Sequence, residues 1–182
     1  MRKKEGIIII IILVLLVIGV GIYILLNNPK EVEEYIPEEE ISEEQLRQTI
    51  VTLYFKNKEN GQIETETRKV DVNVLIKEPY NYLITELING PKNEKLERTI
   101  PDGVKLNSTK LDGDVLIIDF SKEFILNASE QKDEQNKLLN SIVNTLTELT
   151  EVNYIRILID GEENKGFTDN NIMFNKNMER II

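Results

Sequence analysis

Few side chains in this sequence could carry out acid–base or nucleophilic chemistry. The 182 residues include no histidine and no cysteine, which removes the commonest general base, the commonest metal ligand and all thiolate chemistry. Three carboxylates, Asp112, Asp114 and Asp119, lie close together along the chain and are candidates for a metal site or an acid–base pair. We interpret them instead as a hairpin turn and a strand-end cap of the turn at Ser121, because calcium loops need denser oxygen ligands.

The other polar motifs also have structural interpretations. Asp160-Gly161 is typical of a turn that ends a strand, and the glycosylation sequons at 107–109 and 127–129 are patterns that chance produces often. Arg156 lies among isoleucines, and it belongs either to an exposed sheet face used in assembly or to an ordinary solvated face. The sequence therefore predicts no catalytic residue, no cofactor site and no metal site.

The balance of charge argues against a nucleic-acid partner. Asp and Glu number 32 against 22 Lys and Arg, for a formal net charge of −10 at pH 7. No cluster of basic residues of the kind that binds a phosphate backbone stands out. An acidic domain should also be repelled by anionic lipid headgroups.

The run from Ile7 to Leu26 is apolar apart from two glycines and a tyrosine. About 20 helical residues span the hydrocarbon core of a bilayer. The basic flank, 1–6, carries Arg2, Lys3 and Lys4, which predicts a cytoplasmic N-terminus and an extracytoplasmic remainder. A cleaved signal peptide is the alternative, but the run is long and no small-residue cleavage site follows it. We therefore expect an uncleaved, single-pass signal anchor over 7–26.

Two further segments follow the expected anchor. Residues 27–46 are rich in glutamate and contain Pro29 and Pro37, a composition typical of an extended, solvated linker. An acidic docking strip for a basic partner is the alternative interpretation. Residues 47–182 have the size and patterning of one globular, extracytoplasmic domain.

The hydrophobic pattern of this domain predicts alternating strands and helices. Strands are expected over 48–56, 65–76, 104–111, 115–120 and 152–160, and helices over 79–89 and 130–149. The continuous apolar run at 115–120 favours a strand that is buried on both faces or central in the sheet, and the tail, 162–182, could add a short strand or hairpin. The order β-β-α-β-β-α-β predicts an α+β two-layer sandwich, a mixed sheet with two helices on one face.

The stretch from Glu78 to Leu106 carries the clearest local signals. Pro79 suits the first position of a helix, and Asn89-Gly90-Pro91 suits its end. Ile100-Pro101-Asp102-Gly103 is a second turn signal before an apolar, alternating run.

These motifs, in this order, resemble the GerM domain of sporulation and spore germination proteins. The resemblance covers roughly 49–161 and includes the signals just described. It also rests on the following segments: Leu53-Tyr54-Phe55, Val104-Lys105-Leu106, Asp114 through Phe120, Val143 through Glu148, and Val152 through Gly161.

The resemblance implies a non-enzymatic interaction module of the cell envelope, acting in sporulation or germination. Part of the fold is similar to the ring-building motif of a sporulation channel, which implies partners among envelope or sporulation proteins, including further copies of this chain. Proteins of this family are often lipoproteins with tandem domains, whereas this chain has one copy and an expected membrane helix. Two alternatives remain: a domain that binds the cell wall or a small ligand, and a carboxylate-dependent hydrolase.

Overall fold

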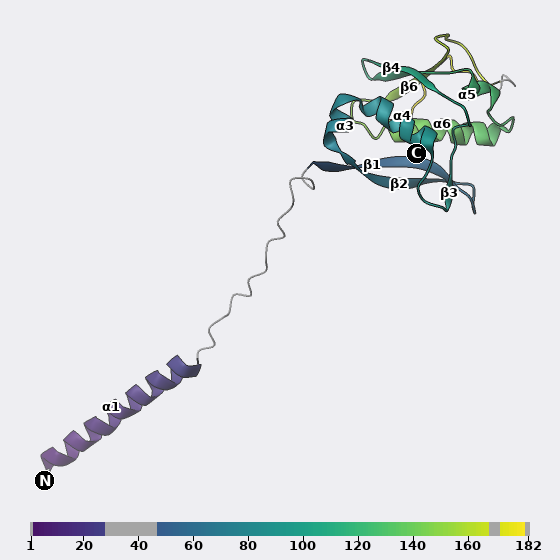
Figure 1. The fold of residues 1–182 in the computed structure, drawn as a ribbon. Coiled ribbons are helices and arrows are strands. Elements are labelled where there is room, and N and C mark those ends of the chain that lie inside the picture. Colours follow the sequence, from purple (N-terminus) through teal and green to yellow (C-terminus); the bar gives the residue numbers. More distant parts are fainter. Residues whose placement is uncertain (1, 28–46, 168–171, 181–182) are drawn as a thin grey trace. The chain divides into compact units, whose positions relative to one another are not determined.

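The computed structural model of the protein describes residues 2–27, 47–167 and 172–180 (Figure 1). The chain divides into two compact units, Met1–Glu40 and Ile41–Ile182. The expected linker, 27–46, lies outside the described residues except for Asn27.

The first unit contains one long helix, α1, Arg2–Asn27, of 26 residues. It covers the apolar run, and its described side chains from Ile12 to Leu26 are exposed. Among the residues whose side chains are described, no helix is both long enough and apolar enough to qualify as a membrane span.

The second unit contains two three-stranded sheets. Sheet A consists of β1 (Gln48–Asn57), β2 (Ile63–Asp71) and β3 (Leu96–Glu97) in the order β2-β1-β3, with antiparallel pairing throughout. Sheet B consists of β4 (Leu106–Asp112), β5 (Val115–Phe120) and β6 (Tyr154–Ile159) in the order β4-β5-β6. In sheet B, β5 pairs antiparallel with β4 and parallel with β6, so the expected central strand is confirmed.

The helices α4 (Pro79–Asn89) and α6 (Lys132–Leu146) lie between the two sheets (Figure 1). Both contact β1, while α4 also contacts β4 and α6 also contacts β6. The α+β class is confirmed, but the prediction of a single mixed sheet with helices on one face is wrong. The two sheets do not merge because α6 occupies the edge of β1: Thr145 Oγ1 accepts a hydrogen bond from Tyr54 N at 3.1 Å, and Ser141 Oγ donates to Tyr54 O at 2.5 Å.

The predicted second strand, 65–76, is also corrected. β2 ends at Asp71, and a short helix, α3 (Val72–Lys77), follows it. The Asp71 side chain caps this helix by accepting a hydrogen bond from Asn73 N at 2.8 Å, which is the usual role of aspartate before a first helical turn. The alternation of valines beyond Val70 therefore does not mark a strand, and no residue of α3 is buried.

The signals around α4 are confirmed. Pro79 begins the helix, and Gly90 follows it at φ 89°, a backbone conformation that glycine adopts without steric penalty. α6 is shorter than predicted, and the turn at Ser121 leads into a four-residue helix, α5 (Glu123–Leu126).

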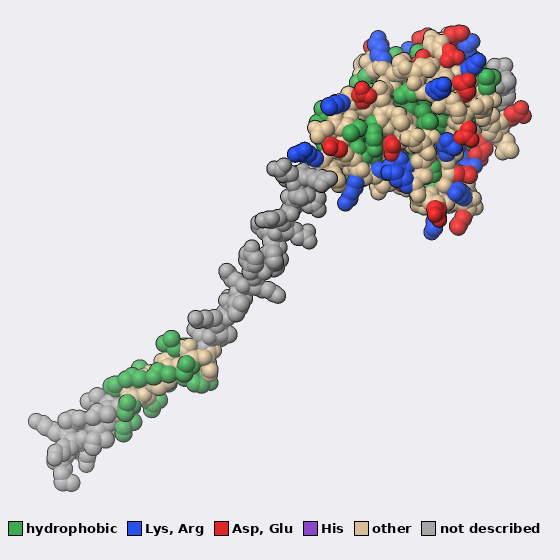
Figure 2. All heavy atoms as spheres, in the orientation of Figure 1, with side chains coloured by type: hydrophobic (Ala, Val, Ile, Leu, Met, Phe, Trp, Pro, Cys, Tyr) green, Lys and Arg blue, Asp and Glu red, His purple; other side chains and the backbone are tan. Residues whose placement is uncertain are grey.

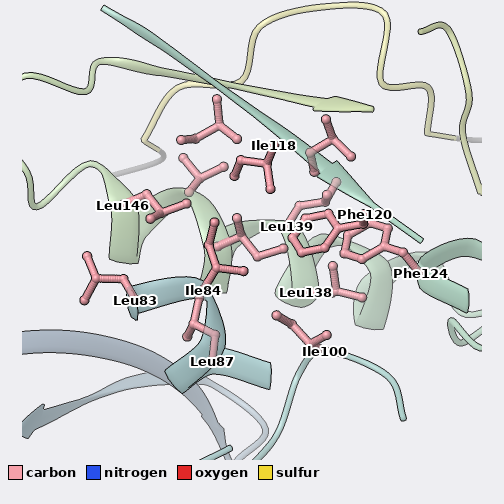
Figure 3. Close-up of a cluster of buried hydrophobic side chains, with 14 of the residues drawn as sticks. Leu83, Ile84, Leu87, Ile100, Ile118, Phe120, Phe124, Leu138, Leu139 and Leu146 are labelled. Atoms are coloured by element: carbon pink, nitrogen blue, oxygen red, sulfur yellow. The ribbon is translucent and has the colours of Figure 1, made fainter. Parts of the chain in front are cut away.

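The core fills the space between the helices and both sheets, and Figure 3 shows the part of it that includes β5 of sheet B. Leu83, Ile84 and Leu87 of α4 face Leu138, Leu139 and Leu146 of α6, with Ile118 and Phe120 of β5 beside them. The wide apolar stripe of α6 is needed because this helix buries side chains against both sheets.

The tail contributes two aromatic side chains to the core. Phe167 and Phe174 pack edge to face at 5.1 Å, and both contact Phe124, which stacks on Phe120 at 4.5 Å. Isolated antiparallel bridges join Gly166 to Met173 and Ile155 to Met178, so single bridges stand where a short strand or hairpin was expected, within the described part of the tail. Residues 168–171 and 181–182, also part of the predicted tail, lie outside the described residues.

Candidate functional site

The three aspartates singled out in the sequence serve local structure. Asp112 and Val115 flank the β4–β5 turn. The main-chain oxygen of Asp114 accepts hydrogen bonds from Asn153 N at 2.9 Å and Tyr154 N at 3.1 Å. We expected Asp119 to cap the turn at Ser121, but its carboxylate instead accepts a hydrogen bond from Gly161 N at 2.9 Å. Among the described residues, no group of three or more His, Cys, Asp or Glu side chains could hold a metal ion.

The other motifs also have local partners. Asp160 and Gly161 form the predicted turn after β6, with φ angles of 50° and 75°. Arg156 is half-buried and donates from Nε to Asn177 Oδ1 at 2.9 Å, so the tail contacts the sheet face that carries Arg156. In the two sequons, Asn107 is exposed, whereas Asn127 donates from Nδ2 to Asp102 O at 2.7 Å and holds the turn at Ile100-Pro101-Asp102-Gly103.

Sheet A contains a buried cation that sequence reasoning missed. Arg68 of β2 is 6% exposed and its guanidinium lies 5.6 Å from the centre of the Phe55 ring. It donates to Glu66 Oε1 at 2.7 Å, to Glu86 Oε2 of α4 at 2.5 Å, and to Gly90 O at 2.8 Å. A buried guanidinium is tolerated only with such a full set of acceptors.

Glu66 extends this network to the loop that follows α4. Its carboxylate accepts hydrogen bonds from Lys92 N at 3.0 Å and Asn93 N at 2.8 Å. Burial works against ionisation, but the hydrogen bonds from Asn93 N and from the Arg68 guanidinium hold the pKa of Glu66 below its ordinary value. The network therefore fixes the Asn89-Gly90-Pro91 segment against β2.

A signal for Arg68 was present in the sequence. In an antiparallel pair, residues directly opposite each other point to the same face, and Arg68 is opposite the buried Val51. A cation on the inward-facing side of a strand predicts hydrogen-bond acceptors on the elements that pack against that side. The pairing of β2 with β1 would have placed Arg68 on this side.

A second ion cluster lies on the opposite face of sheet A. Tyr54 Oη donates to Oε1 of Glu148, two residues after the end of α6, at 2.7 Å, and Arg180 of the tail pairs with the same carboxylate at 2.5 Å. Burial, together with the neighbouring Glu148 carboxylate, raises the pKa of the Tyr54 hydroxyl above its ordinary value. This cluster joins β1, the segment after α6 and the tail, and it offers no pairing of nucleophile and base.

A cleft of about 440 Å³ opens beside the Ile100–Gly103 turn. Its lining residues come from the turn, the segment after α5 and the start of α6: Arg98, Thr99, Ile100, Pro101, Asp102, Asn127, Ser129, Glu134, Gln135 and Leu138. Arg98 pairs with Asp102 at 2.7 Å, and Glu134 pairs with Lys56 at 2.6 Å. Gln135 is 2% exposed and donates to Ser129 O at 3.0 Å, while its Oε1 has no partner among the described residues.

Comparison with known proteins identifies the domain. The family model described as "Germane: Sporulation and spore germination" matches residues 52–165. The tandem GerMN domains of the sporulation protein GerM from Bacillus subtilis superpose with a TM-score of 0.62 at 23% identity, over 79% of this chain and 50% of that chain. This chain therefore spans half the length of the tandem protein.

Two further solved structures are similar. The first GerMN domain of the same Bacillus subtilis protein gives a TM-score of 0.61 at 20% identity, over 72% of this chain and 98% of that chain. A candidate lipoprotein from Clostridium perfringens gives 0.50 at 31% identity, over 76% and 92%. No curated protein sequence matches the chain. The resemblance stated from the sequence is confirmed, and the chain belongs to the Germane family of sporulation and spore germination domains, with a GerMN-like α+β fold.

Proposed function

We propose that this protein is a non-enzymatic, membrane-anchored module of the bacterial envelope that assembles with other proteins during sporulation or spore germination. The observation that carries the proposal is the match of residues 52–165 to the sporulation and germination family. Arg68, Asp119 and Glu148 offer further support, since their polar groups are engaged in hydrogen bonds and ion pairs that stabilise the fold.

The proposed anchor is the apolar run of α1, Ile7 to Leu26. At 1.5 Å per residue, about 20 helical residues reach roughly 30 Å, the thickness of the hydrocarbon core. Its described side chains are hydrophobic on the face visible in Figure 2. Arg2, Lys3 and Lys4 would remain in the cytoplasm and the Germane domain would lie outside. The Clostridium perfringens relative, a candidate lipoprotein, supports an envelope location reached by a different attachment.

The proposed partners are proteins rather than nucleic acids. On the face of the domain visible in Figure 2, basic and acidic side chains are interspersed rather than gathered into a basic patch. A surface of mixed charge favours contacts with proteins over contacts with a phosphate backbone.

Deletion of the gene, followed through sporulation and germination, tests this function. The expected result is fewer heat-resistant spores or slower germination, restored by the full chain. A variant with Leu15→Lys and Ile18→Lys in α1 should fail to restore it, because two cations in the apolar run oppose insertion. A matched variant, Leu15→Ala and Ile18→Ala, should restore it. Normal spores and normal germination in the deletion strain would refute the proposal.

The cleft beside the Ile100–Gly103 turn supports a second candidate function, the binding of a cell-wall fragment or another small polar ligand. Its lining supplies Arg98, Asn127 and Gln135 as polar groups, and Gln135 Oε1 has no partner among the described residues. Sedimentation of the full chain with purified cell wall tests it. Retention that is lost in Arg98→Ala and kept in the exposed control Lys122→Ala would favour this function over assembly.

A further inference from the structure

The cleft beside the Ile100–Gly103 turn contains two amide side chains whose orientation is fixed by the main chain. Gln135 Nε2 donates to Ser129 O at 3.0 Å, and Asn127 Nδ2 donates to Asp102 O at 2.7 Å. A main-chain carbonyl oxygen only accepts hydrogen bonds, so in both cases the amide nitrogen, and not the amide oxygen, must face it. Gln135 Oε1 and Asn127 Oδ1 are therefore the acceptors that these two side chains offer to a ligand.

Gln135 Oε1 is the acceptor with the greater need of a donor. Gln135 is 2% exposed, and its Oε1 has no partner among the described residues. A buried acceptor without a hydrogen bond lowers the stability of a fold, and such groups are rare in native proteins. Gln135 is one of the residues that line the cleft, so a ligand in the cleft that carries a donor group would supply the bond.

The charged groups of the cleft lining are already paired with opposite charges. Arg98 pairs with Asp102 at 2.7 Å, whereas Glu134 pairs with Lys56 at 2.6 Å and with Lys137 at 3.1 Å. Among the described residues that line the cleft, no other side chain is charged. An ionic ligand would therefore meet no opposite charge that lacks a partner, and the lining favours a neutral ligand.

The rest of the lining combines apolar surface with hydroxyl groups. Ile100, Pro101 and Leu138 form the apolar part, and the first and last of these are neighbours in Figure 3. Thr99 and Ser129 add the hydroxyl groups. The volume of about 440 Å³ is in the usual range for pockets in which apolar surface and a few polar groups orient a ligand.

We propose that this cleft binds a neutral carbohydrate unit, with a hydroxyl or amide N–H group of the sugar donating to Gln135 Oε1. A sugar ring matches the lining because its C–H faces are apolar and its hydroxyl groups both donate and accept hydrogen bonds. This inference rests on the second candidate function, the binding of a cell-wall fragment or another small polar ligand, and it names the chemical class of that ligand.

Other groups of the lining complete the recognition of a sugar. Asn127 Oδ1 accepts from a second hydroxyl group. Arg98 uses one N–H group on Asp102 and one on Ile88 O, and since a guanidinium carries five, the others donate to sugar oxygens. Pro101, which is partly exposed, lies against a C–H face of the ring.

Binding of a defined sugar to the full chain in phosphatidylcholine vesicles tests the proposal. The probe is the β-1,4-linked tetramer of N-acetylglucosamine, which carries hydroxyl and amide N–H donors and no charge. Saturation-transfer NMR spectroscopy of the probe measures its binding, and the vesicles contain no competing sugar. We expect saturable binding that spermidine, a cation rich in N–H donors, does not displace. Absence of tetramer binding, or displacement by spermidine, would overturn the inference.

Replacement of the buried amide tests the role of Gln135. Gln135→Met introduces an apolar side chain of similar length and should weaken tetramer binding by about fivefold or more, because one hydrogen bond to the sugar is lost. Gln131→Met is the matched control, since Gln131 is an exposed glutamine that precedes α6 and is not part of the lining. Equal affinities of the two variants would overturn the inference.

A second pair of variants keeps the proposal testable if Gln135→Met does not fold. Ser129→Tyr places a large side chain in the cleft, whereas Glu130→Tyr adds the same side chain at an exposed neighbour outside the lining. The first should lose tetramer binding and the second should keep it, with circular dichroism confirming that both are folded. Undiminished binding to folded Ser129→Tyr would overturn the inference.

Sedimentation with purified cell wall separates failure of this inference from failure of the function on which it rests. Retention on the wall that depends on Arg98, without any binding of the tetramer, would overturn the carbohydrate assignment and leave the binding function of the cleft intact. If the natural chain neither sediments with the wall nor binds the tetramer, both are overturned.

Discussion

Sheet B packs against the helices through apolar and aromatic side chains, whereas sheet A carries a buried ion network on the same inner side. Phe120 and Phe124 stack at 4.5 Å beside sheet B, while Arg68 lies over Phe55 in sheet A and reaches the end of α4. The energy of apolar packing depends little on pH or on which apolar side chain is in contact, whereas a buried ion pair is stable only when its acceptors are in place. Sheet A therefore adds to its own buried apolar side chains, Leu53 and Phe55 among them, an ion network that holds the end of α4 against β2.

The largest expected effect comes from the aromatic cluster beside sheet B. Phe124→Ala removes a fully buried ring and should lower the free energy of unfolding by about 4 kcal/mol. Urea unfolding of the full chain in detergent, followed by circular dichroism, measures this change. The control Leu126→Ala alters a neighbouring side chain that is 65% exposed, and it should change stability by less than about 0.5 kcal/mol. Equal losses in both variants would contradict the account of the core.

Loss of the buried cation should have the next largest effect. Arg68→Ala leaves the carboxylates of Glu66 and Glu86 without their cation and should destabilise the domain by about 3 kcal/mol. Lys69→Ala, an exposed neighbour on the same strand, serves as the control in the same urea titration. If Arg68→Ala were no more destabilising than Lys69→Ala, the network would not hold sheet A to α4.

A smaller effect is expected where α6 covers the edge of β1. Ser141→Ala removes the donor to Tyr54 O and should lower stability by about 1 kcal/mol, the usual contribution of one hydrogen bond. Asn136→Ala, exposed on the same helix, is the matched control. An unchanged midpoint in Ser141→Ala would show that the edge of β1 does not depend on this contact.

The smallest expected effect is a change in pH dependence. The pKa of Glu66 is lowered in the folded state, so its stabilisation is present above the ordinary glutamate pKa and is lost as pH falls through the folded value. Glu66→Gln should therefore flatten the decline of stability between pH 7 and pH 3, as measured by urea midpoints. The exposed control Glu59→Gln should leave that decline as in the natural chain. Identical slopes for all three proteins would argue against an ionised Glu66 network.

Local signals explain what could be predicted from the sequence. Pro79 and Gly90 act within one turn of the helix that they delimit, so α4 and its family resemblance were accessible from the residues alone. The Asp71 cap of α3 was equally local, yet the alternating valines after it suggested a longer strand. A capping residue inside an alternating run is thus stronger evidence for the start of a helix than the alternation is for a continuing strand.

Long-range contacts explain what could not be predicted. The separation into two sheets depends on the hydrogen bonds of Ser141 and Thr145 to the main chain of Tyr54. The periodicity of α6 gives no sign that these two polar side chains occupy the edge of a strand. Phe167 and Phe174 likewise lie in a polar tail, where isolated aromatic residues give no sign of their place in the core. The candidate cleft combines three such distant segments.

The central claim is the proposal that this chain acts in sporulation or germination as a membrane-anchored module. The most direct measurement is the yield of heat-resistant, germinating spores in a deletion strain, without a complementing gene or complemented with the natural chain or with the Leu15→Lys, Ile18→Lys variant. The account predicts a defect in the deletion strain, rescue by the natural chain and failure of the variant. Equal spore yield and germination in the deletion strain without any complementing gene would contradict it.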